Sequence, residues 1–334
     1  MPNSVILGCG KGLGRIKVFN SEIIEKIMEA GGEPTTDEWI QERTGIRKRC
    51  FAAPKETTAS MAVKAAKNAL RNADISINDI DAIILATVTS DYGGTPSSAC
   101  VVQKALGAKN IPSFDLNAAC SGFIYSLAMA DALIKASFRN ILVIGSETLS
   151  RYINWKDRSV APLLGDGAGC VVISKSSYGD RGIIDWVLHA EGNPKVLVIP
   201  AGGSRCPASE LTVDNNLHTL QMDGKEVFKF AVQKAIQTIT LLIERNHLML
   251  NEIDLIFVHQ ANMRITNAIS EKLKIPREKF FDTVSTCGNT SSASIPIGLD
   301  IAEKKGVLKF GNKILLIGFG GGLTWGGCYC IWGK

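Results

Sequence analysis

The sequence predicts an α/β protein built from two duplicated halves. Apolar strand-like runs alternate with helical runs along its 334 residues, as in buried, largely parallel sheets with helices on their faces. Three strand-like motifs also recur in the same order at near-constant offsets, which favours duplication of one unit over coincidence among similar strands. The offsets are 173 residues from Asp81 to Asp254, 167 from Asp115 to Asp282 and 173 from Gly145 to Gly318.

The helices and the boundary between the halves follow from periodicity and punctuation. Helical patterns cover residues 58–72, 123–136, 227–245 and 264–273. A polar, glycine-containing segment at 174–182 separates the halves, so we expect one half at 1–175 and the other at 183–334. The glycine-rich run at 8–14 lacks the glycine spacing of a dinucleotide-binding fingerprint and predicts a turn after the first strand.

Composition excludes several classes of function. Hydrophobic residues make up 46% of the chain and charged residues 21%, as in an ordinary globular protein. The net charge of +5 permits an acidic partner, but the absence of a clustered basic run argues against nucleic-acid binding. We find no run of about 18 apolar residues, so we expect neither a membrane span nor a secretion signal.

The cysteines indicate reduced thiols rather than disulfides or a metal site. Nine cysteines at wide spacing form an odd set, which is unlike a disulfide framework and favours a cytoplasmic protein. The close pair Cys328 and Cys330 lacks the C-x-x-C spacing of a zinc site. We therefore expect no metal.

Cys120 is the candidate nucleophile. The segment 115–123 reads as an extended stretch that ends on this cysteine where a helix begins, and residues 123–134 are apolar on nearly every side. Such a helix lies inside a large protein. The helix dipole and free backbone N–H groups at its start favour a thiolate, which attacks thioesters and other acyl groups. The alternative is an inert core cysteine.

His259 and Asn289 each follow a strand-like run, where α/β proteins gather catalytic groups. The other three histidines lack this setting. By the 167-residue offset, Cys120 and Cys287 occupy corresponding positions, so their loops would meet across a pseudo-twofold axis. One loop would supply the nucleophile and the other Asn289, with Cys287 structural.

Long, correctly ordered motifs give a family resemblance from the first strand to the last. The matching segments are 37–40, 43–47, Ala118-Ala119-Cys120-Ser121-Gly122-Phe123, His259-Gln260-Ala261-Asn262, Gly288-Asn289-Thr290-Ser291 and Gly320-Gly321-Gly322-Leu323-Thr324-Trp325-Gly326. In these motifs the chain resembles the β-ketoacyl-acyl carrier protein synthase III family of the thiolase superfamily. This resemblance implies a five-layer α-β-α-β-α sandwich.

The resemblance also implies the reaction and the residues that perform it. A homodimer would transfer an acyl group from acyl-CoA to Cys120 and condense it with malonyl-acyl carrier protein, releasing carbon dioxide, without a metal or nucleotide cofactor. His259 and Asn289 would bind the oxygen of the malonyl thioester. The backbone N–H groups of Cys120 and Gly321 would bind the oxygen of the acyl-enzyme. Two alternatives stay open: a secondary-metabolite acyltransferase that does not decarboxylate, and a non-catalytic acyl-CoA-binding scaffold.

Coenzyme A recognition has a candidate in the segment 35–49. Thr35 and Glu38 predict a capping box at a helix start, Trp39 can stack on adenine, and Arg43 can meet phosphates. The alternative is a solvated helix. The resemblance favours Trp39 and Arg43 and adds Arg158 and Asn262 as coenzyme contacts.

The resemblance further implies a carrier-docking face and an acyl pocket. Lys229, Arg264 and Lys272 match a basic face for the acidic carrier protein. The pocket would include Leu220, Phe319 and Thr95, which in this family reaches into the partner subunit's pocket. Acetyl-specific relatives carry phenylalanine at that position, so the smaller threonine predicts primers longer than acetyl. The alternative is that Leu220 or Met222 fills the space.

Overall fold

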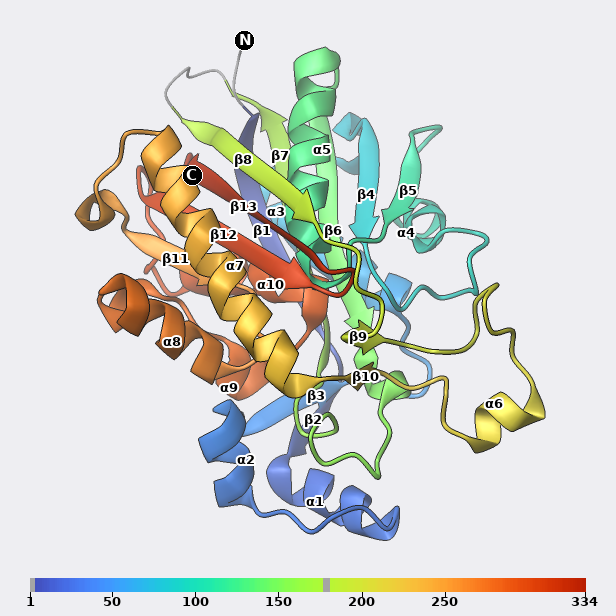
Figure 1. Ribbon diagram of the computed structural model, residues 1–334. Helices are drawn as coiled ribbons and strands as arrows, with labels where there is room; N and C mark the ends of the chain where they lie inside the picture. Colours follow the sequence, from blue (N-terminus) through green and yellow to red (C-terminus); the bar gives the residue numbers. More distant parts are fainter. Residues whose placement is uncertain (1–3, 177–180) are drawn as a thin grey trace.

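The computed structural model describes residues 4–176 and 181–334, which form two stacked sheets with helices between and outside them (Figure 1). The first sheet has the strand order β1-β7-β6-β4-β5 and the second β11-β12-β13-β8. Their bounds are β1 (Ser4–Leu13), β4 (Ala82–Ala86), β5 (Ser113–Leu116), β6 (Asn140–Thr148), β7 (Asp166–Lys175), β8 (Gly182–Ala190), β11 (Leu255–Val258), β12 (Lys313–Gly320) and β13 (Thr324–Ile331).

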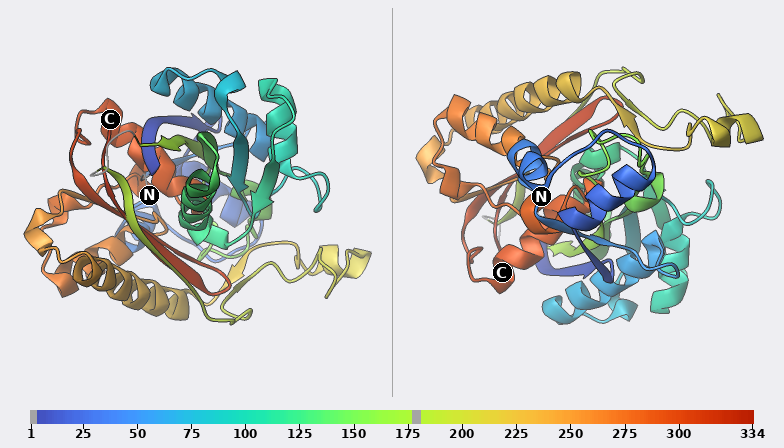
Figure 2. Two further views of the ribbon diagram at one scale, coloured as in Figure 1. Left: turned by 90° about the horizontal axis from the view of Figure 1, so that it is seen from above. Right: turned by 90° about the horizontal axis from the view of Figure 1, so that it is seen from below.

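Helices cover the sheets in three layers (Figure 2). Helices α3 (Thr58–Ala73) and α4 (Ser98–Leu106) pack on the outer face of the first sheet. Helices α5 (Gly122–Ala136) and α10 (Ser294–Lys304) lie between the sheets, and α7 (Gly224–Arg245) and α8 (Met263–Leu273) cover the second sheet. The predicted five-layer sandwich and its four predicted helices are confirmed.

Shorter elements connect these helices and strands. They include two small two-stranded sheets, β2 with β3 and β9 with β10. Their bounds are β2 (Ile16–Phe19), α1 (Asn20–Glu29), α2 (Asp37–Thr44), β3 (Lys48–Phe51), η1 (Ile77–Asp79), η2 (Ala119–Ser121), η3 (Leu149–Tyr152), β9 (Leu197–Val198), α6 (Glu210–Asp214), β10 (Gln221–Met222), η4 (Leu250–Glu252), η5 (Arg277–Lys279), α9 (Val284–Cys287) and η6 (Ser291–Ala293).

Equivalent strand pairs in the two sheets are aligned in the same register. Ile83 of β4 pairs with Leu142 of β6, and the residues 173 positions further on, Ile256 of β11 and Leu315 of β12, pair in the same way. The duplicated architecture is therefore visible residue by residue. Strand β7 ends the first sheet at Lys175 and β8 joins the second at Gly182. This change of sheet supports our proposed boundary between 1–175 and 183–334.

The glycine-rich run near the start is a strand rather than the turn that we expected. Gly8, Gly10 and Gly12 alternate along β1 on the side that faces α3. A Cβ atom on Gly10 would lie only 2.3 Å from the carbonyl oxygen of Ala65. The glycines therefore serve close packing between this strand and the alanine-rich face of α3.

One segment is long and apolar enough to cross a membrane by length and composition, although we expected none. Residues Ala119–Ala136 meet that test of length and composition, with 56% of the segment buried inside the fold. However, α5 contacts strands of both sheets. A core helix passes the same test, and the position of α5 between the sheets accounts for its composition.

Candidate active site

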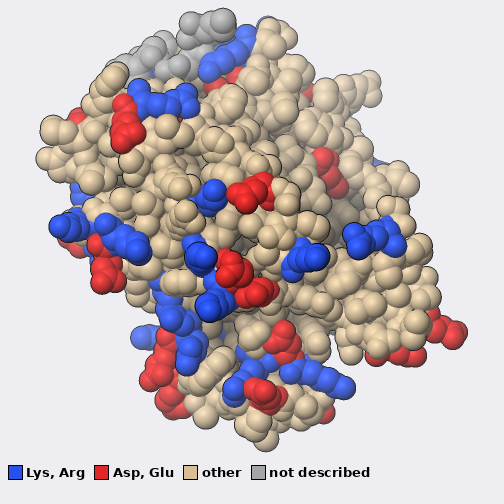
Figure 3. Space-filling model, viewed as in Figure 1, with Lys and Arg blue, Asp and Glu red and all other residues tan. Residues whose placement is uncertain are grey.

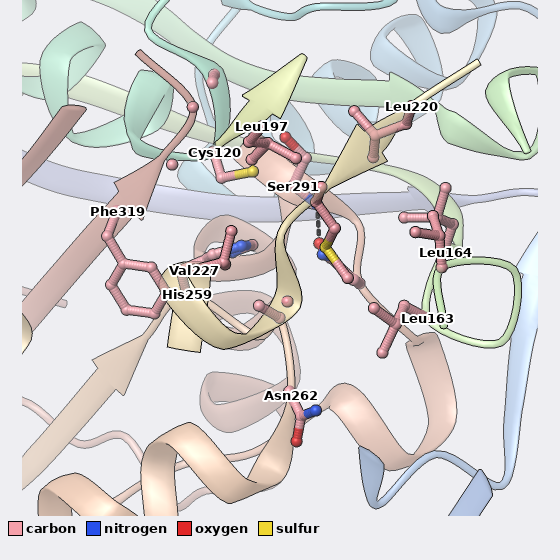
Figure 4. A pocket seen from close by; sticks show the side chains of 18 of the residues that line it. Cys120, Leu163, Leu164, Leu197, Leu220, Val227, His259, Asn262, Ser291 and Phe319 are labelled. Atoms are coloured by element: carbon pink, nitrogen blue, oxygen red, sulfur yellow. Dashed lines mark hydrogen bonds between the residues drawn. The ribbon is translucent and has the colours of Figure 1, made fainter. Parts of the chain in front are cut away.

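A cavity of about 960 Å³ opens where loops of the two halves meet (Figure 4). Cys120, His259 and Asn289, far apart in the sequence, all line it. Cys120 follows β5, His259 follows β11 directly, and Asn289 follows the short helix α9. The structure therefore brings the three predicted catalytic side chains together, with Cys120 and His259 beyond the carboxyl ends of β5 and β11. The strand that we expected before Asn289 is only an isolated bridge between Ile256 and Phe280.

Cys120 lies in the 3₁₀ turn η2, immediately before α5. Burial, with a smaller contribution from the nearby Glu147 carboxyl, raises the pKa of its thiol to about 12, whereas the hydrogen bond from Ser291 acts in the opposite direction. The thiolate that we expected from the helix start is therefore not the resting form, because loss of solvent outweighs the helix dipole at this site. The proton must leave the sulfur as it attacks.

His259 is a neutral hydrogen-bond donor. Its Nδ1 atom lies 2.8 Å from Ser294 Oγ, and the backbone N–H of Gln260 donates to the same oxygen over 3.3 Å. Because Ser294 Oγ already accepts from Gln260, we assign its proton to the bond with Nδ1 and the imidazole proton to Nε2. Burial lowers the pKa of His259 to about 3, so the ring stays uncharged. The Phe319 ring packs edge-on against it, with ring centres 5.3 Å apart.

Asn289 is fixed by its backbone and by one side-chain oxygen. Its N–H donates to the Leu163 carbonyl over 2.8 Å, and its carbonyl accepts from Gly165 N–H over 2.9 Å. Its Oδ1 atom accepts from Ser291 N–H over 2.8 Å, the dashed line in Figure 4. No residue in the described part of the chain accepts a hydrogen bond from Nδ2, so the amide N–H₂ group remains for a ligand.

The correspondence that we expected between Cys120 and Cys287 is wrong. The offset is 167 residues at Phe114 and Phe281 but 172 at Ala119 and Ser291, because α9 adds residues in the second half. Ser292, in η6 before α10, is the counterpart of Cys120. Cys287 is buried in α9 and does not line the cavity.

The glycine run that begins at the end of β12 lies directly against Cys120. A Cβ atom on Gly320 would lie 2.6 Å from the backbone nitrogen of Cys120, so only glycine allows this approach. Thr324 Oγ1 lies 2.9 Å from the carbonyl oxygens of both Ala118 and Gly321 and ties the two loops together. Gly321 lines the cavity, and no carbonyl among the described residues accepts its N–H. This arrangement supports the predicted oxyanion pair of Cys120 and Gly321.

The four predicted coenzyme-binding residues, Trp39, Arg43, Arg158 and Asn262, all line the cavity. The guanidinium groups of Arg158 and Arg43 lie 5.1 and 5.9 Å from the centre of the Trp39 ring. Asn262 Nδ2 donates to the Arg43 carbonyl over 2.9 Å, which joins the two halves at this side of the cavity. An aromatic face beside two cations suits a nucleotide phosphate ligand.

The predicted capping box is wrong by one residue. Thr36, not Thr35, caps α2 and accepts from Trp39 N–H over 3.1 Å. Thr35 is buried instead. Either of two consecutive threonines could form the N-cap of α2. Because the side chain of Thr35 is buried, Thr36 forms it.

The remaining predicted residues are placed as follows. Leu220 and Phe319 line the cavity, whereas Thr95 is exposed on the loop between β4 and α4, outside it. Arg264 lines the cavity, with its guanidinium 5.6 Å from the centre of the Phe228 ring. Lys229 and Lys272 are exposed and lie outside the cavity, on α7 and α8.

Two charged residues beneath the cavity are not predicted by any motif. Arg49 and Glu147 are both 0% exposed. Arg49 donates to Asn20 Oδ1 and to the Pro162 carbonyl, each over 2.7 Å, and so supports the loop whose Leu163 carbonyl holds Asn289. The sequence does contain a feature that could have identified Glu147, because this charged residue comes two positions after the apolar run 141–145.

The rest of the wall is largely apolar and suits an acyl chain. Leucines from several loops converge on it, as Figure 4 shows. Among residues 4–176 and 181–334, no group of three or more His, Cys, Asp or Glu side chains could hold a metal ion. The lining leucines are Leu149, Leu163, Leu164, Leu197, Leu220 and Leu323.

A thiol, a neutral imidazole and a carboxamide between two thiolase-like halves define a condensing acyltransferase. Comparison with known proteins agrees. Models of 3-oxoacyl-[acyl-carrier-protein] synthase III match residues 114–192, and models of its C-terminal part match residues 243–332. The β-ketoacyl-[acyl-carrier-protein] synthase III of Caldanaerobacter subterraneus subsp. tengcongensis is 46% identical over 331 residues, 98% of each chain.

Solved structures show the same relationship. The crystal structure of 3-oxoacyl-[acyl-carrier-protein] synthase III from Aquifex aeolicus has a TM-score of 0.88 and 41% identity, covering 98% of this chain and 100% of its own. The priming β-ketosynthase of the R1128 polyketide pathway has a TM-score of 0.88 and 32% identity, covering 100% of this chain and 97% of its own. The chain belongs to the β-ketoacyl-[acyl-carrier-protein] synthase III family, and it is an initiating condensing enzyme.

Proposed function

We propose that Cys120 accepts an acyl group from acyl-CoA and that the acyl-enzyme condenses with malonyl-acyl carrier protein. In the first step the Cys120 sulfur forms a thioester, the bond from the acyl carbon to the coenzyme sulfur breaks, and the thiol proton ends on the leaving coenzyme. In the second step malonyl loses carbon dioxide, and its methylene carbon attacks the acyl carbonyl and displaces Cys120. The displaced Cys120 thiolate then takes up one proton from solvent.

The observation that carries this proposal is the convergence of two neutral donors with the nucleophile. His259 Nε2 and Asn289 Nδ2 can both donate to a thioester oxygen, and neither carries a charge that would hold the malonyl carboxylate in place. Donors of this kind stabilise the negative charge that develops during decarboxylation. The similarity to a priming polyketide ketosynthase keeps a secondary pathway as the second candidate.

Two measurements on the purified protein test the reaction. Intact mass after incubation with acetyl-, butyryl- and octanoyl-CoA should show one added acyl group, absent from Cys120→Ala. Malonyl-acyl carrier protein labelled at the free carboxyl should then release labelled carbon dioxide. Acylation without carbon dioxide release would identify a non-decarboxylating acyltransferase, and no acylation by any of these donors would favour a binding scaffold.

The open edge of β5 supports the homodimer. Strand β5 pairs only with β4, so its other edge is unpaired within the described chain. An unpaired edge is a template for another strand. We propose that two copies join there and that the exposed Thr95, on the adjacent loop, enters the partner's acyl pocket. Molar mass in solution tests the dimer.

Thr95 then sets the accepted chain length. A threonine leaves more space than phenylalanine, and each extra buried methylene can add about 0.8 kcal/mol to acyl binding. We expect the wild type to accept butyryl-CoA or longer donors, and Thr95→Phe to narrow the range toward acetyl-CoA with acetyl transfer kept. Strict acetyl preference in the wild type would show that another side chain, such as Leu220 or Met222, closes the pocket.

We propose that the acidic carrier protein docks on Lys229, Arg264 and Lys272. In Figure 3 the face that carries α7 and α8 shows several Lys and Arg side chains with acidic ones between them. Because single exposed ion pairs contribute little, the effect should come from the set. Lys229→Glu with Lys272→Glu, at two exposed positions outside the cavity, should raise KM for malonyl-acyl carrier protein and spare KM for acyl-CoA, whereas Lys67→Glu on α3 should change neither. An equal rise in both constants would contradict the docking face.

We further propose that the reaction needs neither a metal nor a nucleotide cofactor and that the protein works in the cytoplasm. Thioester chemistry on cysteine requires only the donors already described. All nine cysteines are free thiols in the structure, which suits a reducing compartment. Unchanged turnover after dialysis against EDTA would support the first point.

A further inference from the structure

Glu147 joins the two halves behind the nucleophile. It lies near the end of β6, is 0% exposed and does not line the cavity. Its Oε2 atom accepts hydrogen bonds from Thr87 Oγ1 over 3.1 Å, Val88 N–H over 3.1 Å and Thr89 Oγ1 over 2.6 Å. Its Oε1 atom accepts from Ser291 Oγ over 3.1 Å and Ser292 Oγ over 3.0 Å. One oxygen thus serves mainly the first half and the other mainly the second.

The link from Glu147 reaches Asn289 through Ser291. The Ser291 hydroxyl bonds to the Glu147 carboxyl, and the Ser291 N–H donates over 2.8 Å to Asn289 Oδ1. Ser291 has φ of 48°, in the left-handed region that a serine rarely adopts. Such a conformation persists only where surrounding contacts impose it, and the Glu147 carboxyl provides one of those contacts.

We propose that Glu147 is a positioning residue for condensation: by holding Ser291 it aims the Asn289 amide at the malonyl thioester. This inference rests on the proposed function, in which Asn289 serves decarboxylation. Glu147 does not touch the substrate, and it acts through the loop of the opposite half. The alternative is a purely structural buried carboxyl that stabilises the fold and affects both half-reactions equally.

Asp131 offers a matched control, because it is a buried carboxyl far along α5 from Cys120. It is 1% exposed and accepts from Ser4 Oγ, Lys135 Nζ and Trp186 Nε1. Asp131→Asn therefore measures what the loss of a buried carboxylate costs without disturbing the Asn289 loop.

The experiment compares Glu147→Gln with wild type and Asp131→Asn in the two half-reactions. The glutamine side chain keeps one acceptor oxygen, which must face the fixed Val88 N–H. Its N–H₂ group then faces Ser291 and Ser292, whose hydroxyls donate to the carboxyl in the wild type. Acylation is followed by intact mass and condensation by labelled carbon dioxide release from malonyl-acyl carrier protein. We expect Glu147→Gln to lower condensation about tenfold or more, as for the loss of buried hydrogen bonds, with acylation within about threefold.

Ser291→Ala is a second variant that deletes only a hydroxyl. Because this hydroxyl also lowers the pKa of the Cys120 thiol, condensation by the variant is measured on acyl-enzyme that has already formed. It should lower condensation in the same sense but by less, since the Ser291 N–H remains bonded to Asn289. Equal loss of both half-reactions in Glu147→Gln, loss of acylation alone, or unchanged condensation in both variants would overturn the proposal. If the wild-type protein itself does not condense, the proposed function is wrong. That outcome is distinguishable from failure of the Glu147 proposal, in which only the variants behave differently from what we expect.

Discussion

The loops η2 and η6 have nearly the same backbone and carry different chemistry. Ala119 opens η2 with φ of 47°, and Ser291 opens η6 with φ of 48°. Helix α5 then begins at Gly122 and α10 at Ser294, 172 residues later. At the position where the first loop presents Cys120, the second carries Ser292, which turns away to bond with the Ala86 carbonyl and Glu147. Duplication thus supplied two equivalent positions, and we propose that only the first became a nucleophile.

Each loop is supported by the central strand of the opposite half. Strand β6 of the first half contacts η6, and β12 of the second contacts η2. A glycine makes each approach possible: Gly145 faces Ser292, and Gly318 faces Ser121. The catalytic loops are therefore shaped by packing between the halves rather than by their own sequence.

The largest expected effect separates the two equivalent positions. Cys120→Ala should abolish the acyl-enzyme and with it condensation, because no other described side chain at this point of the cavity can form the thioester. Ser292→Ala should still acylate, since it removes a structural hydroxyl. Intact mass with acetyl-CoA measures both. A Cys120→Ala protein that still carries an acyl group would show that the nucleophile lies elsewhere.

A smaller effect is expected in the donors that the second half supplies. His259→Ala and Asn289→Ala should still form acyl-enzyme but condense about 10²–10³-fold more slowly, as for the loss of an oxyanion donor. Single-turnover acylation and labelled carbon dioxide release separate the steps. If acylation is lost while decarboxylation persists, the division of labour between the two loops is reversed.

Much of this fold could be predicted from the sequence, because apolar periodicity and repeated motifs report local structure. The four helices and the repeat of β4 and β6 at β11 and β12 followed directly. The glycine run in β1 did not, since an alternating glycine strand resembles a turn until the alanines of α3 are placed beside it. The family motifs also located Cys120, His259 and Asn289, which line one cavity.

What the sequence could not predict depends on contacts between distant segments. The start of a helix suggests a reactive thiolate, but burial by both halves raises the pKa of Cys120 instead. Glu147 is bound by side chains that follow it by 144 and 145 residues. The inserted helix α9 likewise shifts the true counterpart of Cys120 from Cys287 to Ser292, which a constant offset conceals.

The smallest expected effect tests the crossed support directly, through Gly145→Ala and Gly318→Ala. A Cβ atom on Gly145 would lie 2.3 Å from the Ser292 carbonyl oxygen, a backbone atom, so η6 must move. On Gly318 it would lie 2.9 Å from Ile124 Cγ1 and 3.1 Å from Ser121 Cα, where a side chain can adjust in part. Overpacking costs about 1–3 kcal/mol, so we expect Gly145→Ala to lower the thermal midpoint of unfolding more than Gly318→Ala does.

The two variants should also differ in the half-reaction that they slow. If each strand supports the loop of the opposite half, Gly145→Ala should slow condensation more than acylation, and Gly318→Ala should slow acylation more than condensation. The opposite pairing would mean that each strand supports the loop of its own half.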